Sequence, residues 1–460
     1  MFEALKTRWH EKLGYRAILT VSIPLILSTG SLTLQHFVDR MFLTWYSPVA
    51  IAAAMPAAII NFSLMSLFIG TAAYTSTFIA QYHGARRFNR IGPSLWQGLY
   101  FSLFAGLAVL PLYPSAKPLF ALIGHNPEVQ AMEVTYFQWM LFGGFPVTAG
   151  SALAGFFSGR GKTRVVMWVS FATTLINIVL DYGMIFGRLG FPRMGIQGAA
   201  IATVVAQYIR MTLYLLLIVT KKNQQRYNTR SGWRFDREIF RRLIRFGLPS
   251  GTHMFLEMTG FTLLILILGF YGTETLAASN ITFNINHLAF MPVVGLSMGV
   301  AVLVGRCQGQ NDPEQAQRVT WNAFHMGSFF MGSIALAYWL VPQIFLLPYA
   351  ARAEAAAFAP IGALAARLLK FVAVYTFFDG MNIIFAGAMK GAGDTRFIMK
   401  ISVTLSWAVM VIPSLLASQV FHWSLYTVWG FATLYIVSLG LAFLIRFRQG
   451  QWKSMRVIEK

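Results

Sequence analysis

The sequence has few charged residues and almost no cysteine. Only 12% of its 460 residues are charged, about half the share of a typical soluble domain, while 56% are hydrophobic. The mean hydropathy is correspondingly high, at +0.58. Cys307 is the single cysteine, which excludes an internal disulfide and a cysteine-rich metal cluster. These shortages argue against a soluble globular chain.

Acidic residues are scarcer than basic ones. The chain has 16 Asp and Glu against 37 Lys and Arg, a formal charge of +21. Such an excess can indicate nucleic-acid binding. The basic residues, however, lie in short segments between apolar runs, which is the pattern of topology signals on a membrane protein. We therefore expect a lipid bilayer, and no nucleic acid, as the partner.

Long apolar runs recur along the whole chain, and a run of 18 or more residues is long enough for a membrane-spanning helix. The pattern predicts an all-α integral membrane protein of two six-helix lobes, an N-lobe at 1–220 and a C-lobe at 239–460, joined by a basic linker at 221–238. The expected helices cover residues 17–45, 50–82, 93–113, 129–158, 165–187, 196–220, 240–270, 275–306, 318–345, 358–388, 397–418 and 424–446.

The placement of Lys and Arg predicts the orientation in the membrane. If both termini face the cytoplasm, 28 of these residues lie on the cytoplasmic side, 6 on the outer side and 3 within helices. Cytoplasmic loops of membrane proteins carry such an excess. No signal-peptide cleavage site precedes the first apolar run, so that run is expected to remain as a helix. We expect a multi-pass protein of a prokaryotic inner membrane with both termini cytoplasmic.

The two halves repeat each other. With six helices in each half, both enter the membrane from the same side, which makes this a parallel repeat. Pairs at an offset of 225 are Pro24 with Pro249, Ala52-Ala53 with Ala277-Ala278, Gly70 with Gly295, and Gly84 with Gly309. Pairs at an offset of 232 are Gly159, Gly161, Thr163 and Arg164 with Gly391, Gly393, Thr395 and Arg396.

We single out four acidic residues inside the expected helices as candidates: Asp39, Asp181, Glu257 and Asp379. An ionisable group inside a bilayer is costly, so each is a candidate functional residue. They also break the repeat, because Asp39 aligns with Leu264. We therefore interpret the repeated prolines and glycines as scaffold and the acids as the chemistry.

The neighbours of the acids in the first half favour cation binding. Asn177 and Asp181 are four residues apart and share a helix face, and their oxygens suit a hard cation such as Na⁺. His36 shares a face with Asp39 and is positioned to tune it, the alternative being a histidine hydrogen-bonded in the core. Arg40 points about 100° away from Asp39. Pro24 removes a backbone hydrogen bond and is expected to act as a hinge.

In the second half, Tyr375 lies one helical turn before Asp379, where its phenol is able to hydrogen-bond the acid. A buried carboxyl group of this kind can take up and release protons near physiological pH, which ion coupling requires.

Other motifs do not meet their sequence requirements. Gly161-Lys162-Thr163 resembles the end of a phosphate-binding loop, but Phe156 stands where its first glycine is needed. We expect no enzyme activity and no cofactor, so the energy for transport comes from an ion gradient or transport is passive.

These features resemble the multidrug and toxic compound extrusion (MATE) family. The most specific pieces are the segment Phe37-Val38-Asp39, the loop from Lys390 to Arg396, and the intramembrane acids. The resemblance covers essentially the whole chain. It implies a V-shaped pair of lobes around a central cavity and antiport of drugs against H⁺ or Na⁺. His36 and Arg40 depart from the family's usual residues.

The resemblance also implies roles for individual residues. Glu257 and Asp379 look like the C-lobe acids of the NorM-type branch, and Pro24 matches the family's bending point in helix 1. The remaining implied positions form an N-lobe cation site, a candidate for Na⁺: Asp39, Asn177, Asp181 and Thr203. Further candidate modulators are His36, Arg40, Tyr136 and Asn284.

The sequence therefore predicts a monomeric efflux antiporter that exports cationic or amphiphilic drugs in exchange for H⁺, Na⁺ or both. Two alternatives stay open. A flippase of lipid-linked precursors requires a cationic cavity, for which Arg40 and Arg210 are the only arginine candidates. A scaffold or receptor that transports nothing is argued against by the repeat with its asymmetric acids.

Overall fold

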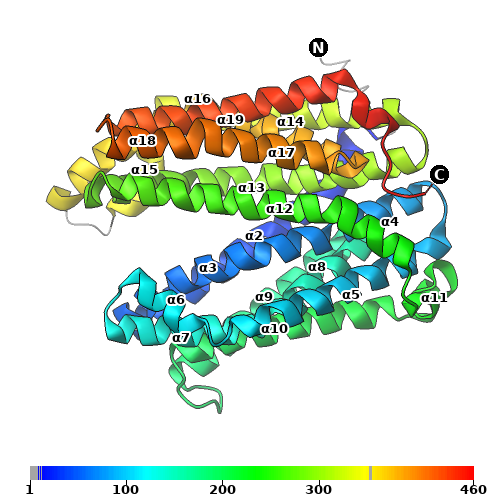
Figure 1. Ribbon diagram of the computed structural model, residues 1–460, viewed down its shortest axis with the longest axis horizontal. Coiled ribbons are helices and arrows are strands. Elements are labelled where there is room, and N and C mark those ends of the chain that lie inside the picture. The colour runs from blue at the N-terminus through cyan, green and yellow to red at the C-terminus, as the bar shows by residue number, and fades with distance from the viewer. Residues whose placement is uncertain (1–8, 10, 12, 352–354, 460) are drawn as a thin grey trace. The chain divides into compact units, whose positions relative to one another are not determined.

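The computed structural model describes residues 9, 11, 13–351 and 355–459, and these residues are almost entirely helical (Figure 1). No β-strand occurs within those ranges. Some of the basic residues used to predict the orientation lie outside the described residues: Lys6, Arg8, Lys12, Arg352 and Lys460.

The helices of the first half are α2 (Tyr15–Tyr46), α3 (Pro48–Ala73), α4 (Thr75–Gly84), α5 (Ile91–Val109), α6 (Ala116–Ile123), α7 (Pro127–Leu141), α8 (Gly144–Ser158), α9 (Thr163–Phe186), α10 (Ile196–Ile218) and α11 (Lys221–Tyr227). Those of the second half are α12 (Arg237–Gly269), α13 (Thr273–Gly309), α14 (Pro313–Leu340), α15 (Pro342–Ala350), α16 (Ala355–Ala392), α17 (Thr395–Leu405), α18 (Ile412–Gln419) and α19 (Leu425–Gln449). Short turns are η1 (Phe88–Arg90), η2 (Leu110–Leu112), η3 (Ser231–Trp233), the π-helical η4 (Ser406–Val411) and η5 (Gln451–Ser454).

Three helices begin with the same local signal, a capping side chain followed by proline. Ser47, Asn126 and Asp312 accept hydrogen bonds from backbone N–H groups at the starts of α3, α7 and α14. In each case proline follows as the first helical residue, where its missing N–H costs nothing. These pairs end the preceding loops sharply and fix where each helix begins.

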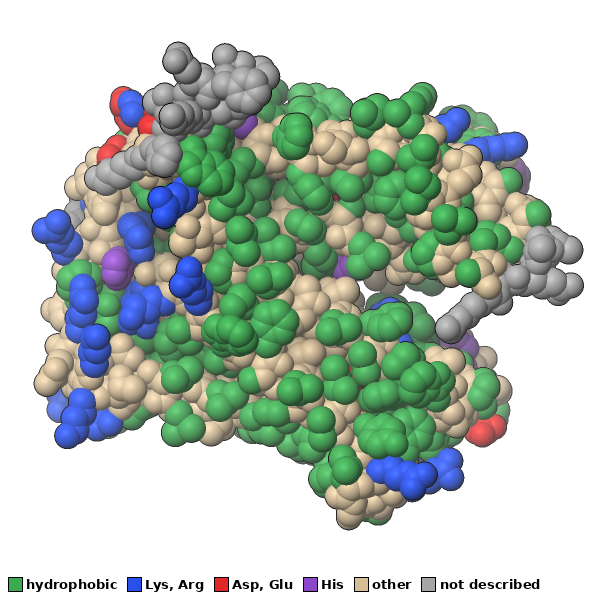
Figure 2. Space-filling view, turned by 180° about the vertical axis from the view of Figure 1, so that it is seen from behind, with side chains coloured by type: hydrophobic (Ala, Val, Ile, Leu, Met, Phe, Trp, Pro, Cys, Tyr) green, Lys and Arg blue, Asp and Glu red, His purple; other side chains and the backbone are tan. Residues whose placement is uncertain are grey.

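The expected number of membrane spans is confirmed. Among the described residues, eleven helices or helix pairs are long and apolar enough to cross a bilayer, and the bent pair α7 and α8 makes a twelfth. The two helices of that pair meet at 46°, where Phe142 and Gly143 interrupt the run. Figure 2 shows hydrophobic side chains over most of the visible face, with most Lys and Arg toward the left and right of the view.

Several predicted helices prove to be interrupted. The helix expected at 50–82 breaks at Tyr74, and the one expected at 318–345 ends at Leu340, since Pro342 starts α15. The helix expected at 397–418 contains the π turn η4. The basic linker 221–238, expected to be polar and without helix, holds the short helix α11, which Thr220 caps. Pro342 explains why the helix ends at Leu340, and the Thr220 cap explains why α11 forms.

The chain forms two compact units. Unit 1 comprises the described residues of Met1–Ile26, Leu256–Gln308 and Asp312–Met455. Unit 2 comprises Leu27–Phe255, Gly309–Asn311 and the described residues of Arg456–Lys460. The units differ from a simple division into sequence halves, because α2 and α12 each pass from one unit to the other. Both transitions lie shortly after the repeated prolines, Pro24 and Pro249.

Packing within the units follows the internal repeat. A Cβ atom added at Gly70 would lie 2.8 Å from the Cα of Gly251, and one at Gly295 would lie 2.5 Å from Ile26. Ile26 and Gly251 are themselves 225 residues apart, like the two glycines. The repeated glycines therefore let a neighbouring helix approach closely at equivalent places in each unit.

Each unit has its own apolar cores. In unit 1, α16 packs along α14 and α19, and the three helices lie side by side in Figure 1. In unit 2, α5 packs along α8 and α9 along α10. The pairing of α9 with its neighbours matters for function, because α9 carries Asn177 and Asp181.

Candidate functional site

A polar seam joins α2 to α9 within unit 2. On α2, buried Ser28 and Ser31 face α9: Ser28 Oγ lies 2.7 Å from Ser170 Oγ, and Thr174 Oγ1 donates to the carbonyl of Ser31 at 3.3 Å. The polar positions then continue at helical spacing along both helices. On α2 they are Ser28, Ser31, Gln35 and Asp39, and on α9 they are Ser170, Thr174, Asn177 and Asp181.

The two acids of the first half meet at the end of this seam. The carboxyl groups of Asp39 and Asp181 lie within hydrogen-bonding reach of each other. With its amide nitrogen facing the acids, Asn177 lies 3.1 Å from Asp39 Oδ1 and 3.2 Å from Asp181 Oδ2. Gln35 Nε2 lies 3.1 Å from the same amide atom of Asn177. The structure thus brings three predicted residues together and adds Gln35.

This cluster has the oxygen ligands of a cation site, and one of its carboxyl oxygens lacks a hydrogen-bond partner among the described residues. Asn177 and Asp181 are fully buried, and Asp181 Oδ1 has no hydrogen-bond partner among the described residues. Asp39 is half-buried. Two adjacent carboxylates, one of them fully buried, repel each other unless a proton or a cation lies with them. Carboxylate and amide oxygens are the ligands that hard cations such as Na⁺ prefer. The residues present therefore fit either H⁺ or Na⁺.

The predicted modulators surround Asp39 to different degrees. His36 and Arg40 are exposed side chains of α2 that interact electrostatically with Asp39. Tyr136 on α7 interacts electrostatically with both acids of the cluster. Thr203 is buried on α10, which packs along α9. Its direct contact with the acids stays a prediction.

The acids of the second half form a separate group in unit 1. Asp379 on α16 hydrogen-bonds the side chain of Asn382 and interacts electrostatically with Glu257 on α12. Tyr375 interacts electrostatically with Asp379, and the hydrogen bond expected between them stays a prediction. Asn284 is exposed on α13. In this half too, two acids from different helices lie within electrostatic range of each other.

Two members of this second group were not foreseen. Tyr435 on α19 interacts electrostatically with both Glu257 and Asp379. Lys390 interacts with Glu257 and lies inside α16, although its basic charge had suggested a cytoplasmic turn. For the α16 residues, the spacing in the sequence did contain a signal. Asn382 comes three residues after Asp379, and Lys390 comes eleven residues after Asp379, which places all three on one helix face.

The loop that resembles the family motif is structural. A Cβ atom added at Gly391 would lie 2.4 Å from the carbonyl oxygen of Ala301. The repeat-related Gly159 makes the same close approach, 2.5 Å, to the carbonyl oxygen of Ser76. Asp394, nearly buried, accepts a hydrogen bond from Arg446 Nε at 2.7 Å. The motif thus locks helix ends together.

A further buried acid, Glu133 on α7, escaped the sequence reasoning although its helix was predicted. Its side chain is fully buried, and its Oε1 lies 2.8 Å from Nδ1 of His125. Glu133 Oε2 has no hydrogen-bond partner among the described residues. The pair lies in the turn before α7 and the first turns of that helix.

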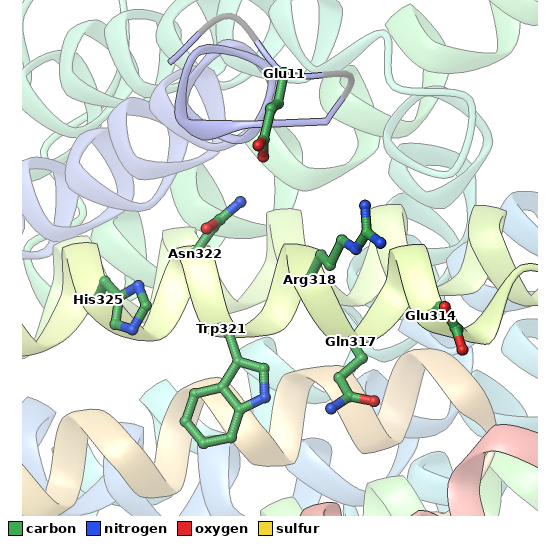
Figure 3. Close-up of a pocket in the computed structure, with 7 residues that line it drawn as sticks. All are labelled: Glu11, Glu314, Gln317, Arg318, Trp321, Asn322 and His325. Atoms are coloured by element: carbon green, nitrogen blue, oxygen red, sulfur yellow. The ribbon is translucent and has the colours of Figure 1, made fainter. Parts of the chain in front are cut away.

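A cavity of about 600 Å³ lies elsewhere in unit 1, against the first turns of α14 (Figure 3). Arg318 and Asn322 point from α14 toward Glu11. None of the predicted site residues lines it. Its lining residues are Glu11, Glu314, Gln317, Arg318, Trp321, Asn322 and His325. We therefore place the candidate site at the acid groups and not at this cavity.

Comparison with known proteins agrees with the fold. A solved outward-facing multidrug resistance MATE family transporter of the MOP superfamily superposes with a TM-score of 0.85 at 20% identity, covering 95% of this chain and 96% of the other. A MOP superfamily transporter from Pyrococcus furiosus superposes with a TM-score of 0.83 at 21% identity, covering 95% and 96%. At these identities the likeness shows the fold, twelve membrane helices in the MATE arrangement.

Curated relatives extend over most of the chain. The probable multidrug resistance protein NorM of Mesorhizobium japonicum is 27% identical over 404 residues, which cover 87% of this chain and 86% of the relative. The multidrug resistance protein PmpM of Pseudomonas aeruginosa is 29% identical over 398 residues, which cover 86% and 82%. The family model MatE matches residues 24–183 and 249–415, segments that begin at the two repeated prolines. The chain belongs to the MatE family.

Proposed function

We propose that the protein is a secondary active multidrug efflux antiporter, which exports organic cations or amphiphilic drugs in exchange for H⁺ or Na⁺ by alternating access. Family membership supports transport, and the relatives named as multidrug resistance proteins support drugs as substrates. It is not proposed to be an enzyme or to need a cofactor. It is expected to act as a monomer in a prokaryotic inner membrane, with both termini cytoplasmic.

The observation that carries the proposal is the pair of half-buried Asp39 and fully buried Asp181, whose Oδ1 has no hydrogen-bond partner among the described residues. Neutralising that pair with H⁺ or Na⁺ stabilises the packed seam between α2 and α9, because the repulsion between the carboxyl groups disappears. A cationic drug is attracted to the same negative charge. Ion and drug therefore compete for one charge, which links the binding of one to the release of the other.

Individual residues supply the rest of the mechanism. In one orientation the side-chain amide of Asn177 donates hydrogen bonds to both acids. In the other orientation its oxygen faces the acids, where it can coordinate a cation bound between them. Loading and release of the ion therefore need only a local change at the end of the seam. Pro24 lies on α2 just before the helix passes into unit 2, so it is placed to let the loaded segment bend.

The acids of unit 1 are proposed as a second coupling or substrate group. Glu257 and Asp379 lie within electrostatic range of each other, and Lys390 supplies Glu257 with a positive neighbour. A positive neighbour reduces the demand of Glu257 for an external cation, whereas the hydrogen-bond partner of Asp379 is a neutral amide, that of Asn382. Asp379 is therefore the stronger candidate of the two for binding H⁺ or substrate.

The test is drug efflux from proteoliposomes with the two gradients imposed separately. Ethidium efflux is measured under a pH gradient without Na⁺, and under a Na⁺ gradient at equal pH. We expect at least one gradient to drive efflux, and collapse of that gradient by an ionophore to stop it. Efflux driven by neither gradient would overturn the antiporter. Movement of a lipid-linked substrate instead of ethidium would establish the flippase alternative.

A further inference from the structure

The last residues of the chain form a strap, Trp452–Glu459, that is anchored at both ends. At its start, Trp452 is fully buried in unit 1, where its ring stacks on Phe447 at 4.8 Å. The Trp452 indole donates to the carbonyl of Phe447 at 2.8 Å, and Gln308 Nε2 donates to the carbonyl of Trp452 at 2.9 Å. The first anchor is therefore a packed aromatic residue with its polar atoms satisfied.

The other end of the strap belongs to unit 2, where five side chains form a socket for it: Gln81, Tyr82, Arg87, Arg90 and Arg242. Val457 is fully buried there. Its N–H donates to Gln81 Oε1 at 3.0 Å, and its carbonyl accepts from Arg242 at 3.3 Å. Both backbone groups of one residue are thus recognised by side chains, as in peptide-binding sites.

The socket also binds the charge of Glu459. Tyr82 donates to Glu459 Oε2 at 2.6 Å, Arg90 Nε donates to Oε1 at 3.1 Å, and Arg87 donates to the backbone carbonyl at 3.1 Å. Arg90 is held in turn by Asp236 at 3.1 Å. Hydrogen bonds to ionised groups are stronger than those between neutral groups. This anchor is polar and reversible, whereas that of Trp452 is apolar.

The spacing between the anchors has a mechanical consequence. Val457 follows Trp452 by five residues, and an extended chain spans at most about 3.6 Å per residue. With both anchors seated, the strap therefore holds Trp452 and Val457 within about 18 Å of each other, whatever the arrangement of the units. Any movement that separates the two anchor sites further requires one of them to let go.

We propose that the strap is a releasable latch on the basic, cytoplasmic face of the transporter: its end seats in the socket of unit 2 in one transport state and leaves the socket in the other. The latch rests on the proposed alternating access. The polar end around Val457 and Glu459 is the end that releases, because water can replace its hydrogen bonds, whereas release of Trp452 would expose a buried indole.

Cleavable cross-linking tests the release. In a Cys307→Ser background, Arg87→Cys and Glu459→Cys are joined by a bifunctional reagent that bridges about 8–10 Å through a reducible disulfide. Arg87 Nη1 and Glu459 Oε1 are 3.7 Å apart in the structure. We expect cross-linking to lower ethidium efflux at least tenfold and reduction to restore it. The untreated double variant and each treated single variant are the controls. Unchanged efflux of the cross-linked protein would overturn the latch.

A binding measurement separates the latch from the proposed function, because it needs no transport. A labelled peptide of residues 454–460 is titrated onto a variant that ends at Met455. We expect it to bind, and the same peptide with Glu459→Gln to bind at least tenfold more weakly. If neither peptide binds, the socket is no docking site and the inference is wrong. If the truncated variant fails to fold, displacement of the spin-labelled strap of the full chain by excess peptide gives the same readout.

Discussion

Asp39 and Asp181 come from helices far apart in the sequence, yet their carboxyl groups lie within hydrogen-bonding reach. Each alone would be a costly charge inside a membrane. Together with Asn177 they make a group whose energy depends on whether H⁺ or Na⁺ is present. Function at this scale depends on two negative charges with one neutral amide between them.

Replacing either acid by its amide tests this directly. Asp39→Asn and Asp181→Asn keep the size and the hydrogen bonds but remove the charge that ion and drug share. We expect each variant to lose at least tenfold in gradient-driven ethidium efflux in proteoliposomes, with little change in thermal unfolding. Asp312→Asn is the matched control, since it alters an N-cap that asparagine serves equally well. Full efflux by both site variants would contradict the coupling role.

At the scale of elements, α2 combines a seam and a hinge. The hydroxyl contacts of Ser28 and Ser31 hold its second part to α9, while its first part, before residue 27, belongs to unit 1. Pro24 lies close to that transition and interrupts the backbone hydrogen bonds of the helix. A helix tied at both ends to different units bends most easily where its own hydrogen bonding is weakest.

Pro24→Ala is therefore expected to stiffen α2. Alanine restores a backbone N–H and has the highest helix propensity, so folding stability should stay equal or rise. Ethidium efflux should fall several-fold, because bending now breaks a hydrogen bond. Pro56→Ala serves as control, since Pro56 lies inside α3, wholly within unit 2. Equal efflux by the Pro24→Ala variant and the wild type would show that Pro24 does not act as a hinge in transport.

At the scale of the whole molecule, the distribution of Lys and Arg predicts which face meets the cytoplasm. Lys117 and Lys222 are both exposed and lie on opposite predicted sides. In a Cys307→Ser background, a membrane-impermeant thiol reagent should label Lys117→Cys in intact cells and Lys222→Cys only in inverted vesicles. The reversed pattern would place the termini outside and move the latch to the outer face.

The strap adds a pH dependence with a defined sign. Burial raises the pKa of Glu459, but hydrogen bonds from Tyr82, its own backbone and Arg90, with the charge of Arg90, outweigh burial and lower it. A lowered pKa means that this anchor is fully present above the ordinary glutamate value, about 4.3, and is lost as the pH falls through the lowered one.

We therefore expect the strap to stay seated from about pH 8 to pH 5 and to detach only in stronger acid. The mobility of a spin label at exposed residue 454 would report this. Asp236, Arg87 and Arg242 share the surroundings, so Glu459→Gln is the control that assigns any acid transition to Glu459. Detachment near neutral pH would contradict the assignment.

Much of the molecule follows from the sequence alone, because a bilayer allows few solutions. Apolar runs of fixed length must be helices, basic loops orient them, and the recurrence of Pro24 at Pro249 reveals the repeat. The four intramembrane acids are visible for the same reason: a charge stands out where charges are costly. Asn177 with Asp181, and the charge of Lys390, are visible as well, though the place of Lys390 inside a helix is not.

Only the tertiary structure decided which of these residues meet. Contacts between helices depend on side-chain packing over long separations, which helical spacing within one segment does not encode. The contact of Asp39 with Asp181, which the resemblance alone had implied, and the addition of Gln35 and Tyr435 are of this kind. So is the strap, because nothing in a short polar tail indicates that Val457 is buried against Gln81. Its place follows from matching partners 376 residues away in the chain, which only the folded molecule brings together.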